Sequence, residues 1–144
     1  MNYKLIKATK NNKEELIKYK LASILDYADA LSEEEKKRII NYVNENIPKQ
    51  IKDYQMISID DKVIGCLLVT NHEDGILLDE LYINPEYQNR GIGTNIIKDL
   101  MRSEFNIYLW VYKNNTKAFN LYQKLGFNIL EETENRYYMK YEGE

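Results

Sequence analysis

The sequence predicts a single α+β domain with an α/β three-layer arrangement, in which a mixed, mostly antiparallel central sheet carries helices on both faces. Three observations support this prediction. Two amphipathic helical segments come early, short β-type segments joined by tight turns follow, and strand–helix–strand units complete the chain. Tight turns join antiparallel strands, whereas a strand–helix–strand unit makes its two strands parallel neighbours. The length of 144 residues suits one domain, spanning residues 1–144.

The N-terminal third is expected to hold one strand and two helices. Alternation predicts a strand over residues 3–8, and a first helix opens at Asn11 and Asn12. Ser32 forms a capping-box pattern that starts a second helix, and Pro48 is expected to end or bend that helix. The apolar residues at helical spacing in the first helix are Ile17, Leu21, Ile24, Ala28 and Leu31.

The remaining elements follow from turn signals and spacing. A turn at residues 60–61 joins two β-rich segments, and the polar cluster 71–75 leads into a third, which favours an antiparallel meander. Gly126 stands where a helix C-terminus is expected. The predicted strands are 54–59, 62–70, 76–83, 106–112, 127–132 and 136–141, and the predicted helices are 91–103 and 115–125.

Composition limits the function classes. Lysines and acids are interleaved and the net charge is -3, so nucleic acid is not expected as a partner. Cys66, the only cysteine, excludes an internal disulfide, suits a cytoplasmic location and lies in an apolar run typical of the core. His72 is the only histidine, so no metal site is expected. No apolar run reaches membrane-spanning length, so neither a signal peptide nor membrane contact is expected.

The segment 88–94, with the sequence QNRGIGT, separates a predicted strand from a predicted helix. Gly91 and Gly93 uncover backbone N–H groups where the helix begins, a geometry that binds phosphate and other anions. A Walker A loop requires Gly-Lys, which does not occur in the chain. A dinucleotide loop requires a third glycine where Ile96 stands. On this loop alone, a plain capping turn with glycines for positive φ stays open.

Two motifs in this order resemble the GCN5-related N-acetyltransferase (GNAT) family. Gln88, Gly91 and Gly93 match the family's Gln/Arg-x-x-Gly-x-Gly/Ala pyrophosphate loop. Residues 115–127 match Asn-x-x-Ala-x-x-x-Tyr-x-x-x-Gly-Phe at every fixed position. The motifs extend over residues 77–127, and the predicted order of elements is also similar. The resemblance implies an acyl-CoA N-acyltransferase fold with acetyl-CoA as the cosubstrate.

The resemblance also implies where acetyl-CoA is held. The strand 76–83 is expected to diverge from 106–112, so that its backbone faces the pantetheine arm, while loop N–H groups hold the pyrophosphate. In the second motif, three residues at i, i+3 and i+7 share one helix face, along which a slender ligand arm fits. The expected cofactor-binding residues are Leu81, Tyr82, Ile83, Gln88, Asn89, Arg90, Gly91, Ile92, Gly93, Thr94, Asn115, Ala118 and Tyr122.

Amine acetylation requires a base, because an alkyl ammonium with a pKa of about 10.4 is almost fully protonated at neutral pH. Asp79 and Glu80 interrupt an apolar strand, where charges must line a cleft or be paired. Glu80 is the predicted base, directly or through a water, and pairing of either acid with a lysine is the alternative. Tyr122 is the predicted general acid for the leaving thiolate. Its alternative is a core aromatic on a helix capped by Asn115.

The predicted function is an N-acetyltransferase that moves an acetyl group from acetyl-CoA to a primary amine by direct transfer in a ternary complex. The acceptor is a small molecule or a peptide or protein amine, and the chain is expected to be a monomer or homodimer. Asp26, Tyr27, Asp29 and residues 53–54 line an acceptor pocket or a solvated helix face. The alternatives are a non-catalytic acyl-CoA sensor or binding module, and a purely structural partner in a complex.

Overall fold

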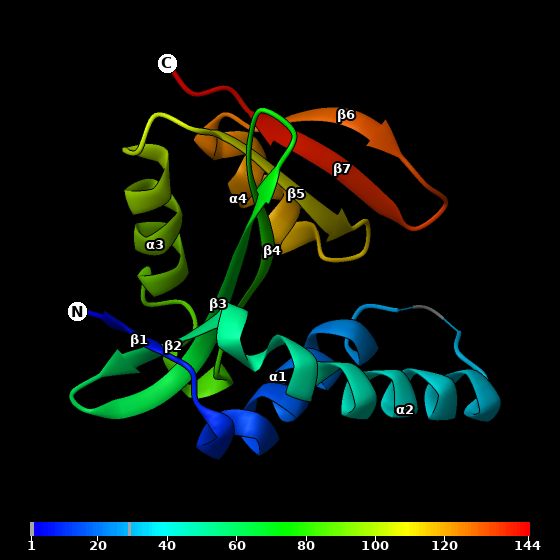
Figure 1. Ribbon diagram of the computed structural model, residues 1–144. Helices are drawn as coiled ribbons and strands as arrows, with labels where there is room; N and C mark the ends of the chain where they lie inside the picture. Colours follow the sequence, from blue (N-terminus) through cyan, green and yellow to red (C-terminus); the bar gives the residue numbers. More distant parts are fainter. Residues whose placement is uncertain (1, 29) are drawn as a thin grey trace.

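The computed structural model describes residues 2–28 and 30–144. An open seven-stranded sheet has the order β1-β2-β3-β4-β5-β7-β6, with helices on both faces (Figure 1). The strands are β1 (Lys4–Lys7), β2 (Tyr54–Ile59), β3 (Lys62–His72), β4 (Gly75–Ile83), β5 (Asn106–Tyr112), β6 (Asn128–Glu132) and β7 (Arg136–Tyr141). The helices are α1 (Lys13–Leu25), α2 (Glu33–Gln50), α3 (Ile92–Met101) and α4 (Thr116–Leu125), with 3₁₀ turns η1 (Lys10–Asn12), η2 (Ile51–Asp53) and η3 (Pro85–Tyr87).

The predicted mixed, mostly antiparallel sheet is confirmed. Every neighbouring pair of strands is antiparallel except β4 and β5, which run parallel across the α3 connection. The parallel pairing is short, because it joins Gly75, Ile76 and Leu77 of β4 to residues 106–108 of β5. In the described part of the chain, the pairing stops there, and the rest of β4 is paired only to β3. The edge of β4 that faces β5 is therefore open from residue 78 onward.

A β-bulge lies in β4 just after the parallel pairing ends. Glu80 is opposite Leu68 of β3 and Leu78 is opposite Val69, so Asp79 is the extra residue. One extra residue reverses the alternation of side chains. Leu78 accordingly packs in the core beneath α3 and α4, whereas Glu80 lies on the opposite face, where it contacts α1.

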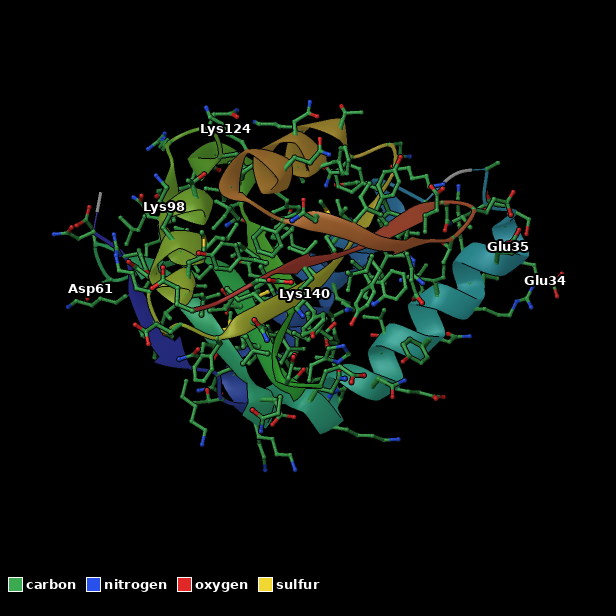
Figure 2. The ribbon with its side chains drawn as sticks, turned by 90° about the horizontal axis from the view of Figure 1, so that it is seen from above. Glu34, Glu35, Asp61, Lys98, Lys124 and Lys140 are labelled. Carbon is green, nitrogen blue, oxygen red and sulfur yellow. The ribbon has the colours of Figure 1, made fainter. Side chains whose placement is uncertain are left out.

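Two hydrophobic cores lie on the two faces of the sheet. One core is shared by the sheet, α3 and α4, and the other by the sheet, α1 and α2. Cys66 is fully buried in the second core, as expected. Figure 2 shows Glu34 and Glu35 at the outer end of α2, which extends away from the sheet. The buried residues of the second core are Ala8, Leu16, Tyr19, Val43, Ile47, Ile51, Tyr54, Met56, Cys66 and Leu68.

The first predicted helix extends too far. We expected Ala28 and Leu31 to continue its apolar face, but α1 ends at Leu25. A closing turn follows, in which the Ala28 N–H donates to the Ile24 carbonyl at 3.0 Å. Ala30 then has a positive φ of 47°, a conformation that a right-handed helix excludes. The residues buried deepest on α1 are Leu16 and Tyr19, which the spacing argument did not select.

Pro48 was expected to end or bend the second helix, and an end at this residue is wrong. Ser32 begins α2 with the predicted capping box, and the helix continues past Pro48 to Gln50. A proline inside a helix costs about 3 kcal/mol. Burying each apolar side chain beside it is worth about 1.5–3 kcal/mol, and Ile47 and Ile51 are both buried. Packing on the inner face therefore outweighs the loss of one hydrogen bond on the exposed face.

None of the helices in the described part of the chain is long and apolar enough to cross a membrane. Within the same residues, no three His, Cys, Asp or Glu side chains are grouped so that they could hold a metal ion.

Candidate active site

The open edge of β4 forms the first part of the candidate site. Beyond the bulge, Leu81, Tyr82 and Ile83 pair with β3 on one side and have no register partner on the β5 side among the described residues. Their backbone groups on that edge are left to bind another extended molecule. The predicted divergence of these two strands is thereby present in the sheet.

The glycine loop lies next to this edge. Gly91 has a φ of 80°, in the left-handed region that favours glycine, and it caps α3 without a side-chain hydrogen bond. A Cβ at Gly91 would meet no atom within 4 Å, whereas a Cβ at Gly93 would meet Leu81 Cδ2 at 3.9 Å. The loop thus adjoins Leu81 of β4 and leaves open space above its amides. The first turn of α3 presents N–H groups to that space, as an anion site requires.

Two side chains of the loop have partners within the chain. Gln88 donates from Nε2 to the Ile83 carbonyl at 2.8 Å, which ties the loop to the end of β4. The Arg90 guanidinium lies 5.1 Å from the centre of the Tyr87 ring. The Gln88 contact fixes the loop beside the open edge. The guanidinium of Arg90 remains exposed at the surface, where it can also meet an anion.

Helix α4 carries the second motif and packs against β5 and the core that it shares with α3. Asn115 accepts a hydrogen bond from the Ala118 N–H at 3.3 Å, so it is the N-cap of α4, the alternative considered from the sequence. Tyr122 is half-buried and packs at 5.6 Å from the Phe127 ring centre. Burial raises the pKa of Tyr122 to about 12, with a smaller electrostatic contribution from the nearby Tyr27. Its hydroxyl therefore stays protonated at neutral pH.

Glu80 has three polar neighbours, Lys20, Cys66 and Tyr54. We call these four side chains the Glu80 cluster. Glu80 is only 5% exposed. Lys20 Nζ from α1 lies 3.1 Å from Glu80 Oε1, and the Cys66 thiol donates to Oε2, also at 3.1 Å. The Tyr54 hydroxyl is buried and has no hydrogen-bond partner in the described residues. Pairing with a lysine, the alternative considered for this carboxylate, is therefore present, whereas Asp79 is exposed.

The cluster perturbs the pKa values of its members. Burial, the largest single effect, lowers the pKa of Lys20, but Glu80 together with Asp79 and Cys66 raises it, so the net pKa lies above its usual value. Burial, and then the negative charge of Glu80, raises the pKa of the Cys66 thiol. Cys66 is therefore a protonated hydrogen-bond donor and a poor nucleophile.

The structure places the predicted residues in two groups of neighbours. The loop adjoins Leu81 of β4, and Tyr27, which follows α1, lies near Tyr122 of α4. Asn114 Nδ2 strengthens this link by donating to the Tyr27 carbonyl at 2.6 Å. The expectation for Tyr54 is wrong, because this residue is 1% exposed and belongs to the core rather than to an acceptor pocket or a solvated helix face. Asp29 lies outside the described residues.

Sequence reasoning missed Lys20. It lies on a helix far from Glu80 in the chain, and neither spacing nor a motif connects the two. The contact between Cys66 and Glu80 had a weak signal, because a hairpin between β3 and β4 brings their segments side by side. Sequence reasoning assigned Cys66 to the core, but it did not pair the thiol with the carboxylate.

An open mixed sheet, a gap beside a short parallel pairing and a glycine loop at the gap define the class of acetyltransferase folds. Solved structures agree at the level of fold. The PaiA N-acetyltransferase from Thermoplasma acidophilum, in complex with coenzyme A, has a TM-score of 0.74 and 22% identity, with 99% of each chain covered. The apo form of YjaB from Escherichia coli has a TM-score of 0.78 and 20% identity, with both chains fully covered.

The model of the acetyltransferase (GNAT) family matches residues 21–127, and the chain belongs to this family. Thialysine N-epsilon-acetyltransferase from Mus musculus is 38% identical over 74 residues, which cover 48% of this chain and 44% of that protein. Spermidine N(1)-acetyltransferase from Escherichia coli K12 is 36% identical over 69 residues, which cover 44% and 37%. The chain spans less than half the length of these curated relatives.

Proposed function

We propose that the chain is an acetyl-CoA-dependent N-acetyltransferase that transfers the acetyl group directly to a primary amine in a ternary complex. The observation that carries the proposal is the glycine loop, whose uncapped helix N-terminus adjoins the unpaired edge of β4. A diphosphate needs several N–H donors at a helix N-terminus, and an extended amide-bearing arm needs a free strand edge. Both features occur side by side here.

The residues for acetyl-CoA follow from that arrangement. The backbone of Leu81, Tyr82 and Ile83 would receive the pantetheine arm, and the loop from Gln88 to Thr94 would receive the diphosphate. Bound there, acetyl-CoA supplies the activated thioester carbonyl. The small side chain of Ala118 leaves room on α4 between the cap at Asn115 and the phenol of Tyr122.

Glu80 and Tyr122 would handle the protons. An acceptor ammonium with a pKa of about 10.4 must lose a proton before it attacks, and we assign that proton to Glu80, directly or through a water. Tyr122, with a pKa raised to about 12, keeps its proton at neutral pH and would donate it to the departing sulfur. The inert state of Cys66 supports direct transfer without an acyl-enzyme.

The acceptor class is proposed from the named relatives. Thialysine and spermidine, the compounds in their names, both carry a primary alkyl amine. A primary alkyl amine of a small molecule is the acceptor that we propose, and a peptide or protein amine is the broader alternative. Carboxylates are natural partners for such ammonium groups, and the site contains both Asp79 and Glu80.

A thiol-release assay with acetyl-CoA and a panel of alkyl amines tests the proposal. We expect release of coenzyme A that depends on the amine and a higher melting temperature when coenzyme A is added. A melting shift without turnover for any amine would support the sensor alternative instead. A melting temperature unaffected by coenzyme A would contradict the binding site itself.

A further inference from the structure

The environment of Glu80 leaves little room for a second cation. Oε2 accepts the hydrogen bond from the Cys66 thiol, and Lys20 Nζ lies 3.1 Å from Oε1. The carboxylate side chain is 3% exposed. A substrate ammonium that gives its proton to Glu80 must come close to this buried carboxylate, beside which Lys20 Nζ already lies. Each carboxylate oxygen can accept more than one hydrogen bond, so the two cations compete mainly because their charges repel each other in a buried site.

Lys20 and Glu80 form an ion pair without a regular hydrogen bond. Lys20 Nζ lies 3.1 Å from Oε1, but no donor in the described residues makes a hydrogen bond of regular geometry to that oxygen. The Lys20 side chain is 24% exposed, so it reaches solvent while Glu80 does not. The Cys66 thiol donates to Oε2 independently of Lys20. The carboxylate therefore keeps a neighbouring donor if Lys20 moves away.

We propose that the Lys20 ammonium is an internal stand-in for the acceptor ammonium, so that a charged acceptor must displace it from Glu80 Oε1. This inference rests on the proposed function, in which Glu80 receives the acceptor's proton. Lys20 then weakens the binding of every charged acceptor and selects for acceptors whose remaining contacts compensate. An acceptor that is neutral at the operating pH does not compete with Lys20 for the carboxylate in the same way.

The test is Lys20→Met, which removes the charge and keeps an unbranched chain, with Lys18→Met as the control on an exposed position of α1. Butylamine, charged at neutral pH, is compared with aniline, which is uncharged. Removing one partly screened competing charge should lower the KM for butylamine about three- to tenfold while leaving the KM for aniline unchanged. Calorimetry of butylamine with the protein alone should show the same tightening.

An unchanged or higher KM and Kd for butylamine would overturn the inference, as would an equal change for butylamine and aniline. Lys20→Gln provides a second neutral variant that can still donate a hydrogen bond, if Lys20→Met does not fold. Failure of the proposed function gives a different pattern. In that case the wild-type protein releases no coenzyme A with any amine, whereas failure of the Lys20 inference leaves turnover intact and the KM ratio unaltered.

Discussion

The two faces of the sheet contribute to the candidate site in different ways. The region that we propose for the coenzyme uses backbone groups: the free edge of β4 and the first turn of α3. The Glu80 cluster, which we propose for the acceptor side, uses side chains from α1, β2, β3 and β4. Backbone geometry is set locally by glycines, whereas the cluster exists only after distant segments pack. A sequence motif can therefore predict the coenzyme region, whereas no motif predicts the Glu80 cluster.

Of the substitutions that test this comparison, Gly93→Val should have the largest effect, a loss of coenzyme A binding. A side chain there covers the loop amides, and losing two charge-assisted hydrogen bonds of about 1.5–3 kcal/mol each weakens coenzyme A binding more than about 100-fold. The space at Gly93 tolerates a Cβ, so the melting temperature should change little. Calorimetry with coenzyme A measures the affinity.

Thr94→Val is the matched control for Gly93→Val, because it removes a hydroxyl from the same turn without covering the amides. We expect a loss of affinity of less than about tenfold, the equivalent of one hydrogen bond. If Gly93→Val binds coenzyme A as the wild type does, the backbone region is not the coenzyme site.

Tyr122→Phe should reduce kcat by about 10²–10⁴-fold, the usual range for a positioned general acid. The dissociation constant for coenzyme A should change by less than about threefold, because packing against Phe127 is retained. Tyr141→Phe is the control, since Tyr141 lies 5.6 Å from the same Phe127 ring. Unchanged turnover in Tyr122→Phe, measured by thiol release, would remove the phenol from the reaction.

Glu80→Gln should lower kcat by about 100-fold, at the low end of the range for general acid–base groups. The amide is isosteric, so the loss reports proton transfer rather than shape, and thiol release between pH 6 and 9 measures it. Asp79→Asn is the control on the adjacent, exposed bulge residue. The reverse outcome, with Asp79→Asn inactive and Glu80→Gln active, would move the base to Asp79.

Tyr54→Phe should have the smallest effect, and on stability rather than catalysis. Its buried hydroxyl lacks a hydrogen-bond partner among the described residues, so removing it should raise the free energy of unfolding by about 1 kcal/mol at pH 7. Burial, and then the Glu80 charge, raises the pKa of Tyr54. As pH rises, the unfolded chain therefore releases this proton first. The contribution of the raised pKa to the free energy of unfolding is fully present below about pH 10 and is lost as pH rises further.

Urea unfolding of Tyr54→Phe at pH 7 and at about pH 10.5 tests both parts of this prediction. The variant should lose less stability between the two values than the wild type does. Tyr42→Phe is the control, since Tyr42 is 61% exposed on α2 and should change neither value. A lower stability of Tyr54→Phe at pH 7 would show that the hydroxyl has a partner in solution.

Much of the fold could be predicted because its signals are local. Ser32 and Glu35 form the expected capping box, Gly126 has the left-handed conformation of a helix C-terminus, and the turn residues Asp60 and Asp61 both have positive φ. Each of these features depends on residues within a few positions of one another. The strand bounds 54–59, 106–112 and 136–141 were also predicted without error.

The sequence predictions that failed depend on tertiary packing. Pro48 carries a correct local signal for a helix end, but burial of Ile47 and Ile51 overrides it. Helix α1 ends at Leu25 and a turn closed by the Ala28 N–H follows, although the apolar spacing continues to Ala28 and Leu31. Lys20 reaches Glu80 because α1 packs on this face of the sheet, and no pattern within α1 distinguishes Lys20 from Lys18.

The three residue pairs between β4 and β5 have a mechanical consequence. They divide the sheet into two parts, one of four strands and one of three, which are joined only by this short parallel pairing. A Cβ at Gly75 would lie 2.0 Å from the Asn106 carbonyl oxygen, so β4 and β5 are closely packed where they pair. A molecule bound between the open edge of β4 and β5 would connect the two parts of the sheet. Amide hydrogen exchange in β5 and β7 should then slow when coenzyme A binds, although β5 and β7 are already paired along residues 107–112 without it.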